Sequence, residues 1–76
     1  MPKIPSVKIS RLLKTLLHLG FVEHRQSGSH LQLKHPDGRR VTIPIHSGKD
    51  IKKGTLNGIL KDIRITRDEF IEALRS

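Results

Sequence analysis

The strongest constraint on the fold is a turn signal between two alternating segments. Residues 36–38 read Pro-Asp-Gly, in which proline fixes φ, aspartate bonds its own backbone and glycine tolerates positive φ. Apolar and polar residues alternate before this turn, over 29–34, and after it, over 40–46. This pattern predicts an antiparallel hairpin with one apolar face. The side chains of that face are Leu31, Leu33, Val41, Ile43 and Ile45.

The same alternation predicts an accessible polar face. A third strand is expected over 21–26, where charged residues blur the pattern. Pro44 lacks a backbone N–H, so the return strand should lie at an edge of the sheet. The polar side chains of the accessible face are His30, Gln32, Arg40, Thr42 and, at the end of the strand, His46.

Helices are expected on both sides of the strands. Residues 1–9 read as an extended basic arm, because Pro2 and Pro5 disfavour helical geometry in the residues before them. A leucine stripe from residue 12 to 19 predicts a first helix, with Ser10 as its N-cap, Ser6 as the alternative, and Gly20 as its stop.

Two helical patterns follow the strands. Apolar residues at 56, 59, 60 and 63 have helical spacing, and lysines crowd the start of that helix. Lysine is the wrong charge for the positive end of a helix dipole, which points to a function for this cluster. In the last segment, Thr66 and Glu69 form a capping box, with Ile65 and Phe70 at the staple positions.

The expected architecture is an α+β fold in two layers. It has a helix, a three-stranded antiparallel sheet and then one or two helices packed on one sheet face. The 76 residues suffice for a single domain, over 1–76. Cysteine is absent, which excludes disulfides and thiolate zinc sites. No apolar run has the length of a membrane span and the N-terminus does not resemble a signal peptide, so a soluble cytoplasmic protein is expected.

Charge indicates a polyanionic partner. The sequence has 15 basic and 7 acidic residues, a net charge of +8, and the basic excess lies within residues 1–61. Basic domains bind phosphate backbones because binding releases condensed counterions. Phe21 and Phe70 are the only aromatic residues of the Phe, Tyr and Trp types, which argues against single-strand binders that stack bases.

His30 is the main candidate for chemistry. It follows Gly28 and Ser29, whose small side chains allow a polymer backbone to approach closely. RNA carries its own nucleophile, the 2′-hydroxyl, so its cleavage requires a proton acceptor, a proton donor and positive charge. Histidine suits the proton transfers, and His46 is the second candidate.

The lysine cluster is the candidate phosphate site. Its cations are Lys49, Lys52 and Lys53, and the backbone N–H groups of Gly54 and Thr55 add hydrogen-bond donors. His18, His24 and His35 are interpreted as ordinary structural or surface histidines. The seven carboxylates are scattered, and no metal-ligand motif is present, so a metal-independent reaction is expected.

Several motifs together resemble the HicA toxin family of bacterial toxin–antitoxin systems. They are Leu19-Gly20-Phe21, residues 26–30 (Gln-Ser-Gly-Ser-His), residues 35–46 (His-Pro-Asp-Gly-Arg-Arg-Val-Thr-Ile-Pro-Ile-His), residues 53–56 (Lys-Gly-Thr-Leu) and residues 59–61 (Ile-Leu-Lys). The likeness extends over about residues 8–74. Family members often carry an aromatic residue soon after the histidine, where this chain has residues 31–33, Leu-Gln-Leu.

This resemblance implies a double-stranded-RNA-binding-domain-like fold and an mRNA interferase that cleaves RNA and arrests translation. It implies His30 as the catalytic histidine of the Gly-Ser-His motif, and a HicB-type antitoxin as partner in a hetero-oligomeric complex. The general acid stays open between His46 and a lysine. Two alternatives remain: a noncatalytic binder of structured RNA, and an interaction module whose basic face meets an acidic protein.

Overall fold

The computed structural model describes residues 6–45 and 50–75, which form three helices and five strands. In chain order they are β1 (Val7–Lys8), α1 (Ile9–His18), β2 (Val22–Ser27), β3 (His30–Lys34), β4 (Arg40–Pro44), β5 (Asp50–Ile51), α2 (Lys53–Asp62) and α3 (Arg67–Leu74). This is the α+β arrangement that the sequence pattern predicts, with two helices after the main sheet, and it is consistent with the double-stranded-RNA-binding-domain-like fold that the resemblance implies.

The main sheet has the order β2-β3-β4, and both strand pairs are antiparallel. Leu31 lies opposite Ile43, and Leu33 lies opposite Val41. All four side chains are buried, so the predicted hairpin and its apolar face are confirmed. β4 is an edge strand of this sheet, where the missing N–H of Pro44 breaks no ladder. β2 lies one residue later than predicted.

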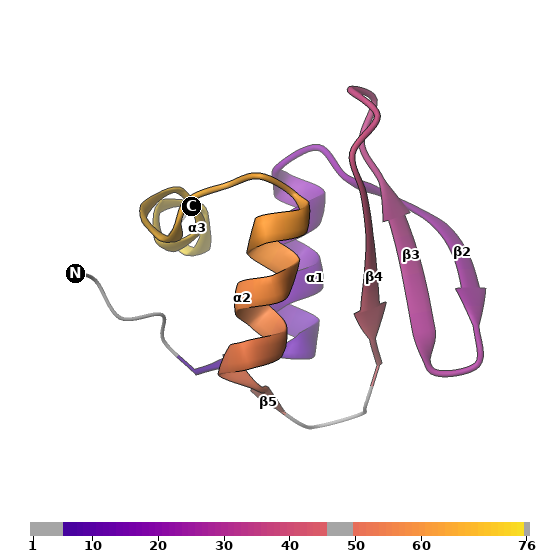
Figure 1. The fold of residues 1–76 in the computed structure, drawn as a ribbon, viewed down its shortest axis with the longest axis horizontal. Coiled ribbons are helices and arrows are strands. Elements are labelled where there is room, and N and C mark those ends of the chain that lie inside the picture. The colour runs from indigo at the N-terminus through magenta and orange to yellow at the C-terminus, as the bar shows by residue number, and fades with distance from the viewer. Residues whose placement is uncertain (1–5, 46–49, 76) are drawn as a thin grey trace.

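The helices lie on one side of the sheet (Figure 1). α2 packs on β4, and α3 packs on α1 at the side of the molecule away from the sheet. α1 and α2 run in the same direction, so both begin at the same end of the molecule. The opposite face of the sheet has no helix over it (Figure 1).

Helix α1 begins earlier than the sequence predicts. The short strands β1 and β5 pair with each other, so Val7–Lys8, within the predicted extended arm, is part of a ladder. The N-cap of α1 is Lys8, not Ser10 or Ser6, and Ile9 is already helical. The side chains of Val7 and Ile51 are buried where the two strands pair. Burial of these two apolar residues ties the start of α1 to the start of α2.

Gly20 ends α1 as predicted. Its φ is 103°, and its N–H donates to the carbonyl of Leu17 at 3.1 Å. The N–H of Phe21 donates to the carbonyl of Leu16 at 3.0 Å. These two bonds form a Schellman motif, which needs a residue of positive φ at this position. Phe21 and Leu16 are both buried, which provides the apolar contact that accompanies the motif.

One apolar cluster joins the helices to the sheet. Its largest fully buried side chains are Phe21, Phe70, Leu12, Leu16, Leu33, Ile43, Leu56 and Ile63. The partly buried Leu13, Leu19, Ile45, Ile65 and Leu74 pack around it. Leu17, predicted as part of the leucine stripe, is instead 48% exposed.

Within residues 6–45 and 50–75, none of the helices is both apolar enough and long enough to span a bilayer.

Candidate nucleic-acid interface

His30 is held by a tight turn and by both neighbouring strands. It is the first residue of β3, directly after Gly28 and Ser29, and it pairs with Ser27 across the turn. Gly28 has a φ of 58°, which a type II′ turn requires at its first central position. Pro44 lies opposite His30 on the other side. The turn itself therefore requires this glycine, whether or not a ligand approaches closely here.

The imidazole of His30 is accessible. The residue is exposed, and its ring makes no hydrogen bond to any of residues 6–45 and 50–75. Both ring nitrogens can therefore meet a ligand. Imidazole exchanges protons near neutral pH, so this is a position where acid–base chemistry on a bound molecule is feasible.

The outer face of the sheet around His30 is cationic. Arg25 lies opposite Gln32, and Lys34 lies opposite Arg40, so all four side chains share the face of His30. Among the described residues, none of these cations has a carboxylate within ion-pair distance. A hollow of about 270 Å³ is lined by residues of β3 and β4 (Gln32, Leu33, Lys34, Arg40, Val41 and Thr42) and by Asp62 of α2, so it involves the helix side of the sheet as well as this face. The predicted polar face is confirmed for the residues that the structure describes.

Arg25 was not predicted for this face, because its place depends on a β-bulge. The β2–β3 register shifts between Glu23 and Arg25, so that Glu23 lies opposite Leu33 on the other face. In a regular strand, residues two apart share a face, and Glu23 would add a carboxylate beside Arg25. Every residue of β2 is exposed, so the sequence carries no apolar alternation that could have indicated the bulge.

The lysine cluster forms the start of α2. Lys52 is the N-cap, Lys53 is the first helical residue, and Gly54 and Thr55 complete the first turn. Lys52 makes no side-chain cap hydrogen bond with the described residues, and no acidic residue lies in the first turn of this helix. The first N–H groups of a helix have no intrahelical partner, and all four of these residues are exposed. The start of α2 can therefore donate backbone hydrogen bonds to an anion.

A second helix start lies at the same end. α1 likewise has a lysine, Lys8, as N-cap, no side-chain cap and no acid in its first turn. The pairing of β1 with β5 brings the two helix starts together. In Figure 1, the beginnings of α1, α2 and β3 and the end of β4 lie at the lower end of the molecule. His30, as the first residue of β3, thus shares an end with two positive helix termini.

The remaining predicted residues divide into two groups. His46 and Lys49 lie outside the described residues. The other histidines are described: His18 and His24 are exposed, whereas His35 is half-buried. His35 has Nε2 at 3.2 Å from the Leu19 carbonyl, and its ring packs edge-on to Phe21. The role of His35 is structural, as the sequence suggested.

Two carboxyl groups have shifted pKa values, and both lie in turns or caps. A backbone hydrogen bond from Arg39 lowers the pKa of Asp37, with the Arg39 side chain adding to the effect. A backbone hydrogen bond from Thr66 lowers the pKa of Glu69. Within residues 6–45 and 50–75, no three His, Asp or Glu side chains gather in a group suited to a metal ion.

Comparison with known proteins adds one match. A family model described as HicA toxin of bacterial toxin-antitoxin matches residues 9–65, well over half of the chain. The matched segment includes the Gly-Ser-His turn, the main sheet and α2. No curated protein matched the chain.

Proposed function

Since this chain belongs to the HicA toxin family of bacterial toxin–antitoxin systems, we propose that it is a metal-independent endoribonuclease that cleaves mRNA and so arrests translation. It acts in the cytoplasm, where its substrate is, and a HicB-type antitoxin covers it in a hetero-oligomeric complex. The observation that carries the proposal is the exposed His30 ring on a cationic sheet face, at the same end of the molecule as two helix starts whose N-caps are lysines.

The chemistry that fits these groups is attack by the RNA's own 2′-oxygen. A base removes the 2′-hydroxyl proton, the oxygen bonds to the adjacent phosphorus, and the bond to the 5′-oxygen breaks as that oxygen receives a proton. His30 performs one of the two proton transfers. The other group is His46 or a lysine. A Cβ atom on Gly28 would meet nothing within 4 Å, so the turn before His30 has open space in which a sugar–phosphate backbone can lie.

Positive charge stabilises the phosphorane-like transition state. Lys49, Lys52 and Lys53 bring cations, and the N–H groups of Gly54 and Thr55 donate to phosphate oxygens. Arg25 and Arg40 on the sheet's outer face extend the cationic surface along a bound strand. Contacts of this kind recognise the phosphate backbone rather than the bases, so they favour affinity over sequence preference.

The test is cleavage of a labelled RNA by purified protein and by a His30→Ala variant. Removing one acid or base should lower the cleavage rate by roughly 10²- to 10⁴-fold. His18→Ala removes another exposed histidine from helix α1 and should cleave at the rate of the unmodified protein. Circular dichroism of both variants checks that each remains folded.

Three outcomes would contradict the proposal. Undiminished cleavage by His30→Ala would remove His30 from the reaction. Loss of cleavage on exhaustive chelation, restored by a divalent ion, would show a metal-dependent nuclease. Tight RNA binding without cleavage, equal for His30→Ala, would leave a noncatalytic binder of structured RNA. A substrate with 2′-deoxyribose throughout should not be cleaved, because it lacks the nucleophile.

A further inference from the structure

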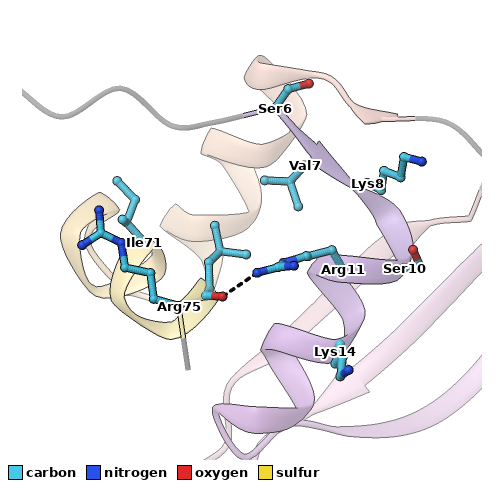
Figure 2. Close-up of a pocket in the computed structure, with 9 residues that line it drawn as sticks. Ser6, Val7, Lys8, Ser10, Arg11, Lys14, Ile71 and Arg75 are labelled. Carbon is cyan, nitrogen blue, oxygen red and sulfur yellow. Dashed lines mark hydrogen bonds between the residues drawn. The ribbon is translucent and has the colours of Figure 1, made fainter.

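A groove lies between helices α1 and α3, away from the main sheet. Its volume is about 720 Å³, and it begins at the β1 strand (Figure 2). Four cationic side chains line it: Lys8, Arg11, Lys14 and Arg75. In Figure 2, Lys8, Lys14 and Arg75 lie on different sides of the groove, and Arg11 reaches across it from α1 toward α3.

Arg11 holds the groove in shape. Its Nη2 donates to the carbonyl of Leu74 at 2.7 Å, and Leu74 is the last residue of α3. The last carbonyls of a helix lack intrahelical partners and carry partial negative charge. A guanidinium from α1 therefore fixes the end of α3, and the two helices present a preformed surface.

The lining of the groove also includes apolar residues. Val7 is buried at one end, while Ile71 and Leu74 of α3 are half-buried. A smaller hollow of about 170 Å³ shares Arg11, Lys14 and Leu74 with it and continues to His18. From residue 11 to 18 the helical rise is roughly 10 Å, about two turns of a partner helix. The surface therefore offers apolar contacts flanked by positive charges over the length of about two helical turns.

Among the described residues, the cations round this groove have no acidic partners. No carboxylate is among the groove's lining residues, and Lys8, Lys14 and Arg75 have none within ion-pair distance among the described residues. A second copy of this chain carries a net charge of +8. Self-association here would place cations beside cations, which disfavours a homodimer.

We propose that this groove docks an acidic amphipathic helix of a partner protein. Apolar side chains of that helix would contact Ile71 and Leu74, and its carboxylates would pair with Lys14 and Arg75. A helix laid into an apolar groove is a recurrent mode of peptide recognition. A phosphate backbone would satisfy the cations but leave the apolar lining without a partner. In Figure 1, α3 lies on the opposite side of α1 and α2 from the main sheet, so the groove is separate from the outer face that carries His30 and shares only the start of α1, at Lys8, with the proposed RNA site.

Three synthetic peptides test the chemistry of the occupant. The first is a labelled helical peptide with leucines at i, i+3, i+4 and i+7 and glutamates flanking them. The second replaces each glutamate by lysine, and the third keeps the composition but disrupts the apolar stripe. In fluorescence anisotropy titrations, the first peptide should have a dissociation constant at least about tenfold lower than that of either other peptide. Amide shifts in NMR spectra should map to α1 and α3.

Charge-reversal variants test the location. Lys14→Glu should lower the affinity for the acidic peptide by about tenfold or more, because it places a carboxylate next to the glutamates of the peptide. Arg25→Glu makes the same change in net charge on the outer face of the sheet, and it should leave peptide binding unchanged. Ile71→Ala tests the apolar contact and should also weaken binding. Circular dichroism of each variant shows whether it is folded.

The test separates this surface from the proposed RNA site. Lys14→Glu should leave RNA cleavage unchanged, whereas Arg25→Glu should weaken RNA binding. Equal loss of peptide binding in Lys14→Glu and Arg25→Glu would show attraction by net charge alone and overturn the proposal. It would also be overturned if the acidic peptide bound no better than the stripe-disrupted one. Amide shifts in the groove on addition of an RNA duplex, with none from the peptide, would assign the groove to RNA instead.

Discussion

At the scale of single residues, the turns of this chain depend on a few positive φ angles. Among the described residues these occur at Gly20, Gly28, Gly38 and Arg64. Arg64 has a φ of 58° and follows the C-cap of α2. Its N–H donates to Lys61, and the next N–H donates to Leu60, the two bonds of a Schellman motif. An arginine thus occupies a position that favours glycine.

Arg64→Gly should therefore stabilise the fold. The left-handed conformation costs a residue with a Cβ atom roughly 1–2 kcal/mol, and the greater entropy of unfolded glycine offsets part of the gain. We expect the free energy of unfolding in urea to rise by about 0.5–1 kcal/mol. Arg64→Ala is the matched control, since it removes the same side chain but keeps the Cβ atom. Equal stability of the two variants would show that φ is not the cause.

At the scale of helices and strands, the helix starts differ in a way that relates to function. α3 has a complete capping box, in which the Glu69 N–H donates to Thr66 Oγ1 and the Thr66 N–H donates to Glu69 Oε1. Asp68 and Glu69 lie in its first turn. α1 and α2 have neither a side-chain cap nor an acidic first turn. The stabilising cap is present on the helix that lies away from the proposed RNA site.

The α3 cap should make stability depend on pH. The Thr66 backbone hydrogen bond holds the pKa of Glu69 below its ordinary value. A carboxyl group with a lowered pKa in the folded state contributes stability at neutral pH, and that contribution is lost as pH falls through the folded pKa. Glu69→Gln should therefore be less stable than the unmodified protein at pH 7.

Urea denaturation at pH 7 and at about pH 2 measures this difference. As the pH falls through the pKa of Glu69, its carboxyl group becomes protonated, so the difference in free energy of unfolding between the two proteins should shrink. Glu23→Gln makes the same charge change at an exposed strand residue that has no hydrogen-bonding side-chain partner among the described residues. If Glu69→Gln lowered the free energy of unfolding by the same amount at both pH values, the cap would have no electrostatic role.

The elements that sequence reasoning placed correctly are those with local causes. The Gly20 stop, the hairpin about residues 36–38 and the Thr66–Glu69 box each depend on neighbouring residues. The early start of α1 depends instead on pairing with β5, across 44 positions of chain between Ser6 and Asp50. Local capping preference for serine was overridden by that tertiary contact.

The same division applies to the candidate site. Alternation sufficed to place His30 and Arg40 on one exposed face. Arg25 required knowledge of a bulge in a strand without apolar residues facing the core. That both helix starts lie at the same end of the molecule as the start of β3 could be known only from the topology of the whole chain. Patterns in sequence thus identify which residues share an element face, but not which elements meet.

At the scale of the whole molecule, the hairpin turn links both helix ends to the sheet. His35 Nε2 lies 3.2 Å from the carbonyl of Leu19, the C-cap of α1. Arg39 Nη1 donates at 2.6 Å to the carbonyl of Ile63, the C-cap of α2. A Cβ atom on Gly20 would lie 2.8 Å from His35 Nε2, so the helix can approach the turn this closely only through glycine.

Arg39 should consequently be one of the most important side chains for stability. Besides Ile63, it donates through Nε to Asp37 Oδ2 at 2.7 Å, and its guanidinium lies 5.2 Å from the centroid of the Phe21 ring. A hydrogen bond to a charged group contributes about 1.5–3 kcal/mol. Arg39→Ala should therefore lower the free energy of unfolding by about 2–3 kcal/mol, a large part of the 5–15 kcal/mol typical of a domain.

A lysine at position 39 separates the effect of geometry from that of charge, and a substitution at position 40 provides the control. Arg39→Lys keeps the charge but lacks the planar fork that reaches two acceptors, so it should lose most of the same stability. Arg40→Ala removes an exposed arginine next along the chain and should change stability by less than about 0.5 kcal/mol. If Arg39→Lys were as stable as the unmodified protein, a positive charge near the end of α2 would be sufficient for stability. The two hydrogen bonds of the Arg39 side chain, to Ile63 and to Asp37, would then not be what joins the helix to the turn.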